Sequence, residues 1–157
     1  MSDLRIGLGV DAHAFADGIP LVLGGVRFDC PRGLAGHSDG DVITHALIDA
    51  LLGAAGLGDI GSLFPSDEST PEGIDSLGLL RDAYARVREA GYELVNADCV
   101  LIGQEPRIAD RRGELEAKLS EVVAAPVSVR ATTTDHLGFT GRGEGLAAQA
   151  VALLAPR

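Results

Sequence analysis

Hydrophobic and polar positions along the chain predict strands and helices that alternate in a short sequence. Residues 4–10 and 127–133 have the composition of strands, whereas Leu80, Tyr84 and Val87 recur at helical spacing. The elements expected are strands over 4–10, 93–102 and 127–133, a hairpin over 21–28, and helices over 41–55, 75–91, 114–123 and 146–154. This order favours one domain over residues 1–157, an α/β or α+β sheet with helices packed on it.

The helix expected over 41–55 has an apolar side and a polar side. Its apolar stripe, which a core would cover, consists of Ile43, Leu47, Ala50, Leu51 and Ala54. Asp41, His45 and Asp49 lie four residues apart on the opposite side. A solvated helix surface explains such a row, and for Asp49 alone that interpretation stays open. His45 invites a chemical interpretation because a second histidine occurs in a suitable place.

That second histidine, His13, follows Asp11 at the end of the first expected strand. In an extended Asp-x-His segment both side chains point to the same side. Together with His45 they would form a three-ligand site for a divalent cation with one position open, which is typical of catalytic zinc. His37, in a glycine-rich loop over 33–40, adds a third histidine nearby. Asp-x-His is a common short motif, so unrelated surface histidines are the alternative.

Two segments near the carboxyl end contain the residues of an anion site. Thr132–Asp135 ends a strand, and Gly138–Gly145, which includes Arg142, leads into the expected terminal helix. Hydroxyls, glycine-exposed N–H groups, a helix N-terminus and an arginine can together bind phosphate. The Gly-Lys-Ser/Thr ending of a Walker A loop is missing. Ordinary strand threonines and turn glycines are the alternative.

Composition and charge narrow the classes of function. The formal net charge of −10 leaves no basic stripe for nucleic acid. Hydrophobic residues make up 46% of the chain, enough for a core, but no apolar run reaches the roughly 18 residues that span a bilayer. The first residues do not resemble a signal peptide, and Cys30 and Cys99 lack metal-type spacing. We therefore expect a cytoplasmic protein that binds neither nucleic acid nor membranes.

Six motifs together resemble one enzyme family. They are DAH (11–13), GHSDGD (36–41), LGDIG (57–61), LFP (63–65), ATTT (131–134) and LGFTGRGEG (137–145). In this order, and from Arg5 to Leu154, the chain resembles the 2-C-methyl-D-erythritol 2,4-cyclodiphosphate synthases of the non-mevalonate isoprenoid pathway. The resemblance implies a phosphorus–oxygen lyase that converts 4-diphosphocytidyl-2-C-methyl-D-erythritol 2-phosphate into the cyclic diphosphate and CMP. The 2-phosphate would attack the β-phosphorus of the same molecule.

The resemblance also implies roles for particular residues. Asp11, His13 and His45 would bind one Zn²⁺ per subunit, and a second divalent cation, Mg²⁺ or Mn²⁺, would accompany the diphosphate. His37 and Thr133 would be catalytic, because they would stabilise the transition state. Substrate would be bound by Asp11, Ala12, His13, His37, Ser38, Asp59, Ile60, Gly61, Phe64, Pro65, Ser66, Asp67, Glu68, Gly103, Gln104, Glu105, Pro106, Arg107, Ile108, Ala109, Thr132, Thr133, Thr134, Asp135, Phe139 and Arg142. Within this set, residues 59–61 and 64–68 would hold the erythritol part and residues 103–109 the cytosine.

The fold that the resemblance implies is a single α+β domain with a four-stranded mixed sheet and helices on one face. The implied assembly is a homotrimer with active sites between subunits, so the polar side that carries His45 would face an interface. Two positions depart from the family pattern. Asp135 stands where Glu is usual, which shortens the carboxylate expected near the second cation, and His136 stands where Lys is frequent.

Two other functions stay open. A zinc-dependent phosphohydrolase could use the same three ligands with metal-bound water as nucleophile, and it would release linear products. A non-catalytic trimer could bind a nucleotide or an isoprenoid phosphate without turnover. The synthase interpretation needs no nucleophilic Ser or Cys, because positioning and charge neutralisation suffice when both reacting groups belong to one substrate.

Overall fold

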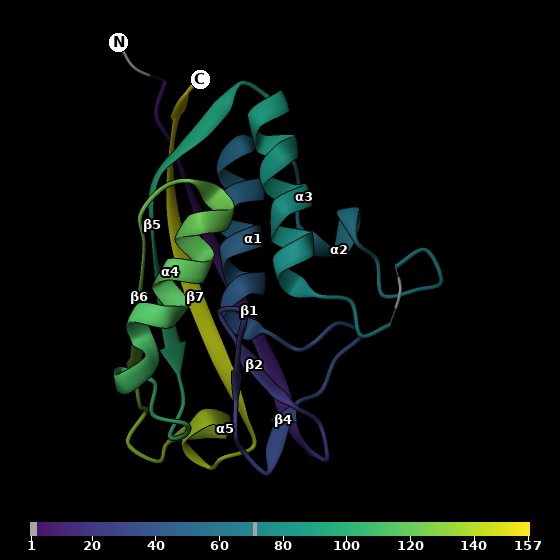
Figure 1. The fold of residues 1–157 in the computed structure, drawn as a ribbon, viewed down its shortest axis with the longest axis vertical. Helices are drawn as coiled ribbons and strands as arrows, with labels where there is room; N and C mark the ends of the chain where they lie inside the picture. The colour runs from purple at the N-terminus through teal and green to yellow at the C-terminus, as the bar shows by residue number, and fades with distance from the viewer. Residues whose placement is uncertain (1–2, 71) are drawn as a thin grey trace.

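The computed structural model describes residues 3–70 and 72–157, whose strands form a five-stranded sheet and a separate hairpin (Figure 1). Across the large sheet the order is β4-β1-β7-β5-β6; β5 and β6 are parallel, and the other neighbours are antiparallel. Its strands are β1 (Arg5–Asp17), β4 (Arg32–Leu34), β5 (Tyr92–Ile102), β6 (Val127–Thr132) and β7 (Gly145–Pro156). The hairpin pairs β2 (Leu21–Leu23) with β3 (Val26–Phe28). The expected α+β class with a mixed sheet is confirmed.

The three long helices lie on one face of the sheet, as expected (Figure 1). The helices are α1 (Val42–Ala55), α2 (Ile60–Leu63), α3 (Ser76–Glu89), α4 (Arg112–Val123) and α5 (Gly138–Gly141), with a 3₁₀ turn at Ala109–Arg111. Helix α1 packs on β1 and β7, and α4 packs on β6. Within the described ranges, no helix combines the length and the hydropathy that crossing a bilayer requires.

The expectation of four strands is wrong, because β4 lies in the segment that the sequence shows as a glycine-rich loop. Three residues are too few to display a hydrophobic period. Strand β4 pairs with the distal part of β1, where Phe15 lies opposite Leu34 and Asp17 lies opposite Arg32. Strand β1 therefore continues well past the predicted end at Val10 and carries Asp11 and His13 in extended conformation.

The terminal helix expected over 146–154 is also wrong, because this segment is strand β7 and pairs with β1 on one side and β5 on the other. Its alanines have high helix propensity, but that preference is weak beside tertiary packing. The buried positions follow a period of two rather than 3.6: Leu146, Ala148, Ala150, Ala152 and Leu154. Small side chains at these positions leave room for α1 on the face above them.

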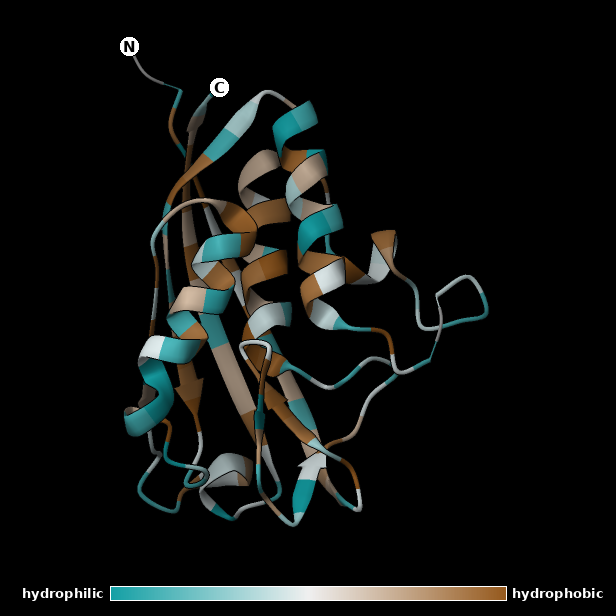
Figure 2. Cartoon of the chain, viewed as in Figure 1, coloured by the Kyte–Doolittle hydropathy of each residue, from teal (hydrophilic) through white to brown (hydrophobic). Residues whose placement is uncertain are grey.

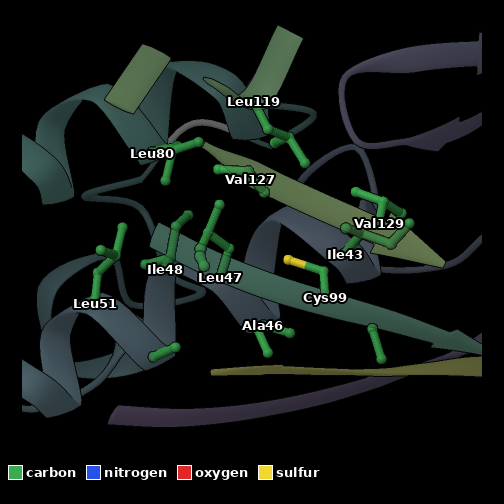
Figure 3. Close-up of a cluster of buried hydrophobic side chains, with 14 of the residues drawn as sticks. Ile43, Ala46, Leu47, Ile48, Leu51, Leu80, Cys99, Leu119, Val127 and Val129 are labelled. Atoms are coloured by element: carbon green, nitrogen blue, oxygen red, sulfur yellow. The ribbon is translucent and has the colours of Figure 1, made fainter. Parts of the chain in front are cut away.

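Helix α1 is buried on nearly every side, so the solvated polar surface that the sequence left open as one interpretation is not observed. His45 is 7% exposed and Asp41, just before the helix, is 0% exposed. Hydrophobic colour covers most of α1, whereas α3 and α4 show hydrophilic stretches (Figure 2). Figure 3 shows the core that surrounds it: side chains from α1, α3, α4, β5 and β6 gather, among them Ile43, Leu47, Leu80, Leu119, Cys99 and Val129.

Two glycines of β1 allow α1 to lie unusually close to the sheet. A Cβ at Gly7 would lie 1.9 Å from the carbonyl oxygen of Ala50, and a Cβ at Gly9 would lie 1.9 Å from that of Ala46. No side chain fits such a gap, so the close contact between the backbones requires glycine at both positions. Alanines on the facing side of the helix complete the contact.

Asp41 ties the start of α1 to the β2–β3 hairpin. Its carboxylate accepts hydrogen bonds from the backbone N–H groups of Gly24 (2.9 Å) and Gly25 (2.8 Å), at the hairpin turn. It also caps the helix by accepting from the backbone N–H (3.1 Å) and the hydroxyl (2.7 Å) of Thr44. Burial raises the pKa of Asp41, and these donated hydrogen bonds oppose that rise.

The face of the sheet away from the helices exposes an apolar strip. Ile6, Leu8 and Val10 of β1 are 74%, 64% and 55% exposed, and Val151, opposite Leu8 on β7, is 41% exposed. These residues alternate with Gly7 and Gly9, which face α1. We refer to Ile6, Leu8, Val10 and Val151 as the open apolar strip.

Substitution of Gly9 by Ala tests the close contact between α1 and β1. We expect Gly9→Ala to lower the free energy of unfolding by about 1–3 kcal/mol, because the new methyl group would overlap the Ala46 carbonyl. The matched control is Gly53→Ala in α1, where a Cβ meets nothing within 4 Å. It should raise the free energy of unfolding by about 0.5–1 kcal/mol through helix propensity. Urea unfolding of both variants measures the effect, and equal stability of Gly9→Ala and wild type would contradict the contact.

Candidate active site

Strand β1 and helix α1 bring together the three residues that spacing predicts as metal ligands. Gly7, Gly9, Asp11 and His13 share one face of β1, so the two polar side chains follow the glycines along the helix and lie beside His45. The Oδ2 atom of Asp11 lies 2.8 Å from Nε2 of His13 and 3.0 Å from Nδ1 of His45. The two ring nitrogens are 3.3 Å apart.

This arrangement fits a divalent cation. One ligand atom from each residue can be chosen so that all three lie within 4.8 Å of one another. Ligand atoms around a tetrahedral zinc, at bond lengths of about 2.1 Å, are separated by roughly 3.4 Å, so only small adjustments are needed. Carboxylate oxygen and imidazole nitrogen are also the donor types that zinc binds. Asp11, His13 and His45 could therefore hold a metal ion.

The electrostatics of this group favour a bound positive charge. Burial opposes ionisation of Asp11, but hydrogen bonds from His13 and His45 outweigh it and lower the pKa of Asp11 to about 2. The hydrogen bond to Asp11 raises the pKa of His13 above its usual value, against the effect of burial. The carboxylate is thus ionised at neutral pH and attracts a proton on imidazole or a cation in its place.

The ring of His45 lies between this group and two buried or half-buried serine hydroxyls. Its Nε2 atom faces away from Asp11 and lies 2.9 Å from Oγ of Ser38 and 2.8 Å from Oγ of Ser76. The Ser76 hydroxyl donates to the carboxylate of Asp39. The Nε2 side of His45 is therefore enclosed by Ser38 and Ser76 of the same chain.

A cavity of about 190 Å³ opens beside the three ligands, and we call it the metal cavity. Nine predicted site residues line it, namely the three predicted metal ligands, His37, Ser38 and part of the segments predicted for the erythritol: Asp11, His13, His37, Ser38, His45, Ile60, Gly61, Phe64 and Ser66. The sequence interpretation missed Thr70, Ile74 and Leu79, which also line it. Leu79 could have been found as a neighbour of Leu80 on the apolar stripe of α3, whereas Thr70 and Ile74 lie in an irregular loop without a pattern.

Of the substrate residues predicted between Asp11 and Glu68, five lie outside this lining: Ala12, Asp59, Pro65, Asp67 and Glu68. Ala12 belongs to the opposite face of β1 from Asp11 and His13. Asp59 begins α2, where its carboxylate accepts from the Ser62 N–H at 2.8 Å. The Asp67 carboxylate accepts from the Ser69 N–H at 2.8 Å. Both carboxylates shape the loop that borders the metal cavity.

Asp49, whose role the sequence leaves open, supports the same border. It is half-buried on α1, and its carboxylate accepts a 2.7 Å hydrogen bond from the backbone N–H of Ile60. This bond fixes the first turn of α2 against α1, and Ile60 and Gly61 line the cavity. Burial raises the pKa of Asp49.

A second cavity, of about 370 Å³, gathers the residues predicted for cytosine, and we call it the loop cavity. Predicted residues in its lining are Gly103, Gln104, Pro106, Arg107, Ile108, Ala109, Thr132 and Thr133. Glu105 instead lines a smaller hollow beside Phe15. Arg112, Arg130 and Ala131 also line the loop cavity and were missed. Arg130 and Ala131 directly precede Thr132–Thr134, and this adjacency to predicted residues could have identified them.

The threonine–glycine segment differs from the predicted anion cradle. The helix expected after Gly145 is strand β7, so only the single turn α5 remains, and it carries no extended helix N-terminus. Thr134 donates to the Leu137 carbonyl at 2.6 Å, and Arg142 pairs with Glu144. Asp135 and His136 have φ of 51° and 66°, in the left-handed region. Phe139 is 43% exposed.

The two residues predicted as catalytic lie in different cavities of the chain. His37 lines the metal cavity, where its ring contacts the Thr70 carbonyl, whereas Thr133 lines the loop cavity. Among the cavities that the described residues form, neither of these two contains both side chains. A single chain thus presents two partial sites.

Comparison with known proteins reveals close relatives. The model of the YgbB family matches residues 4–155. A protein of Rubrobacter xylanophilus named 2-C-methyl-D-erythritol 2,4-cyclodiphosphate synthase is 55% identical over 160 residues, covering 98% of this chain and 96% of its own.

Solved structures agree with this relationship. The bifunctional IspDF of Campylobacter jejuni is 40% identical with a TM-score of 0.96; the match covers 100% of this chain but 43% of that longer one. The CDP complex of IspF from Plasmodium falciparum is 33% identical with a TM-score of 0.85, and the match covers 98% of this chain and 97% of that one.

Loss of one ligand tests the metal centre. We expect the wild-type protein, stripped by chelation and titrated with Zn²⁺ or Co²⁺, to bind one ion per chain. His45→Gln should weaken that binding by more than about 100-fold, because one of three ligand atoms is lost. The matched control is His136→Asn, an exposed histidine outside the metal cavity, which should bind as wild type does. Equal metal content in both variants after dialysis would contradict the assigned ligands.

Proposed function

The chain belongs to the YgbB family, and on that basis we propose that it is a 2-C-methyl-D-erythritol 2,4-cyclodiphosphate synthase of isoprenoid precursor biosynthesis. It converts 4-diphosphocytidyl-2-C-methyl-D-erythritol 2-phosphate into the cyclic diphosphate and CMP, as a phosphorus–oxygen lyase. The observation that carries the proposal is the identity above 50% with named synthases across nearly the whole chain, with the Asp11, His13 and His45 group in place.

The chemistry needs positioning more than acid–base catalysis. Attacking phosphate and leaving CMP belong to one substrate, so an enzyme gains most by holding the two groups in line and by neutralising charge. In this proposal Asp11, His13 and His45 would hold one Zn²⁺ per subunit, which would supply a Lewis acid for phosphate oxygens. A second divalent cation, Mg²⁺ or Mn²⁺, would accompany the diphosphate, with Asp135 as a carboxylate that could serve it. His37 and Ser38 offer hydrogen-bond donors inside the metal cavity. Ile60 and Phe64 offer apolar walls for the erythritol carbons.

We assign the nucleotide to the loop cavity. Its backbone segment 103–109 and the hydroxyls of Thr132 and Thr133 provide donors and acceptors for a base and a phosphate. Arg107 and Arg112 add positive charge in a chain whose net charge is −10. Local cations of this kind are required where a polyanion must approach an acidic protein.

We propose that a homotrimer unites the two cavities. The metal cavity of one subunit and the loop cavity of its neighbour would form each active site, which brings His37 and Thr133 to one substrate. The open apolar strip supports this assembly, because a second copy of the chain would bury Ile6, Leu8 and Val10. Residues 1–157 act in this proposal as one domain in the cytoplasm, a reducing setting that suits free Cys30 and Cys99.

Phosphorus NMR tests the reaction. With the diphosphocytidyl substrate and Mg²⁺, we expect the cyclic diphosphate and CMP, lost after zinc chelation and restored by zinc. Linear phosphate products would contradict the synthase and show instead a phosphohydrolase that uses the same metal ligands. Tight binding of the substrate without turnover, in protein loaded with both cations, would also contradict the synthase and would indicate a non-catalytic trimer that binds the nucleotide.

Mixed trimers test the shared active site. His45→Gln and Thr133→Val should each be nearly inactive alone. Co-expressed with different tags and purified through both, every mixed trimer would contain one intact site in three, so activity should return to about a third of wild type. His45→Gln co-expressed with itself under two tags is the control. Mixed trimers as inactive as that control would contradict an active site between subunits.

A further inference from the structure

The two ring nitrogens of His45 face different surroundings. Nδ1 lies 3.0 Å from the Asp11 carboxylate, in the group that could hold a metal ion. Nε2 points away from that group, toward the hydroxyls of Ser38 and Ser76 at 2.9 and 2.8 Å. His45 and Ser76 are both buried, at 7% and 0% exposed, so the contact between them excludes solvent.

Ser76 is available for this contact because its neighbour caps the helix. Asp75 is the N-cap of α3, and its carboxylate accepts from the backbone N–H of Leu77 at 3.1 Å. The Ser76 hydroxyl is therefore not needed for capping and instead donates to Oδ1 of Asp39. The other oxygen of Asp39 accepts from the backbone N–H of Ser76 at 3.0 Å, so two bonds hold the serine in place.

These contacts determine where the proton of the imidazole resides. An ionised carboxylate can only accept hydrogen bonds, so the Ser76 proton points at Asp39. The Ser76 oxygen then presents a lone pair to Nε2 of His45, and Nε2 must carry the hydrogen. A cation bound beside Asp11 would take the place of a hydrogen on Nδ1, and the neutral ring would then direct its Nδ1 lone pair at that cation.

Ser38 differs from Ser76 although both lie near the same nitrogen. Ser38 lines the metal cavity, whereas Ser76 does not. The Ser38 oxygen also lies 3.3 Å from the backbone N–H of Gly40, which donates to it. Ser38 thus faces the space where a ligand would bind, and Ser76 lies behind the imidazole ring.

We propose that Asp39 and Ser76 are positioning residues of the metal centre, which hold His45 in the Nε2–H form and aim its Nδ1 at the cation. The proposal rests on the metal-binding part of the proposed function and concerns no step of the reaction. Ligating histidines commonly donate their second ring N–H to a fixed acceptor, and loss of that acceptor typically weakens metal affinity by about 10–100-fold. Here the acceptor is Ser76, and the carboxylate of Asp39 acts on His45 through the Ser76 hydroxyl rather than by direct contact.

We refer to the hydrogen-bonded chain from Asp39 through Ser76 to His45 as the relay. Three variants test it, with metal affinity as the main measurement. Ser76→Ala and Asp39→Asn should each weaken Zn²⁺ or Co²⁺ binding by about 10–100-fold, measured by competition with a chelator. The double variant should bind about as weakly as the weaker single variant, because both changes break the same chain of hydrogen bonds. The matched control is Asp75→Ala, which removes the adjacent cap and lowers stability but should keep wild-type affinity.

A second measurement reads the proton directly. In the metal-free wild type, ¹⁵N chemical shifts of the histidine rings should show a hydrogen on Nε2 of His45, whether or not Nδ1 also carries one beside Asp11, and the Nε2 signal should shift in Ser76→Ala. The Co²⁺ absorption spectrum should also change in Ser76→Ala.

Unchanged affinity together with an unchanged His45 ring signal in Ser76→Ala would overturn the relay. A shift of the ring signal in Ser38→Ala but not in Ser76→Ala would overturn it as well, because Ser38 would then be the acceptor. Wild-type protein that binds no ion would overturn the metal centre itself, and the ring signals of metal-free protein would still decide the relay separately.

Discussion

Gly7 and Gly9 let helix α1 lie against strand β1 at a distance that no side chain would permit, since a Cβ at either position would be 1.9 Å from a helix carbonyl oxygen. The same face of the strand continues with Asp11 and His13, so the polar residues meet the helix at the height of His45. The position of the candidate metal centre therefore follows from backbone packing. Small residues on β7, such as Ala148 and Ala150, extend that close packing under the helix.

Carboxylates then attach the surrounding loops to α1. Asp41 holds the β2–β3 turn, Asp39 holds the start of α3 through Ser76, and Asp49 holds the start of α2. Each accepts hydrogen bonds from backbone N–H groups that would otherwise lack partners at a helix or hairpin end. Asp41 and Asp49, which belong to a row that could be a solvated helix surface in the sequence, thus serve as internal anchors. They also place His37, Ser38 and Phe64 around one cavity.

The single chain separates the residues predicted for the substrate and leaves apolar surface uncovered. The metal cavity and the loop cavity each contain part of the predicted substrate site, and the open apolar strip leaves Ile6, Leu8 and Val10 uncovered. In the proposed assembly, contact with further copies of the chain would account for both features. The proposed trimer would bury apolar surface and complete the site in a single step.

The sequence alone was enough to predict the family, the three residues that could hold a metal ion, helix α1 and most residues of both cavities, because motifs, caps and the Asp-x-His geometry are local properties of the chain. Tertiary structure alone decided the remainder. Strand β7 has helix-forming alanines, but pairing on both sides satisfies its backbone and small side chains fit beneath α1. Strand β4 is too short to show a period, and Ser76 acquires its partners only when α3 lies beside α1. Such contacts join residues fifteen or more positions apart, and local pattern carries no information about them.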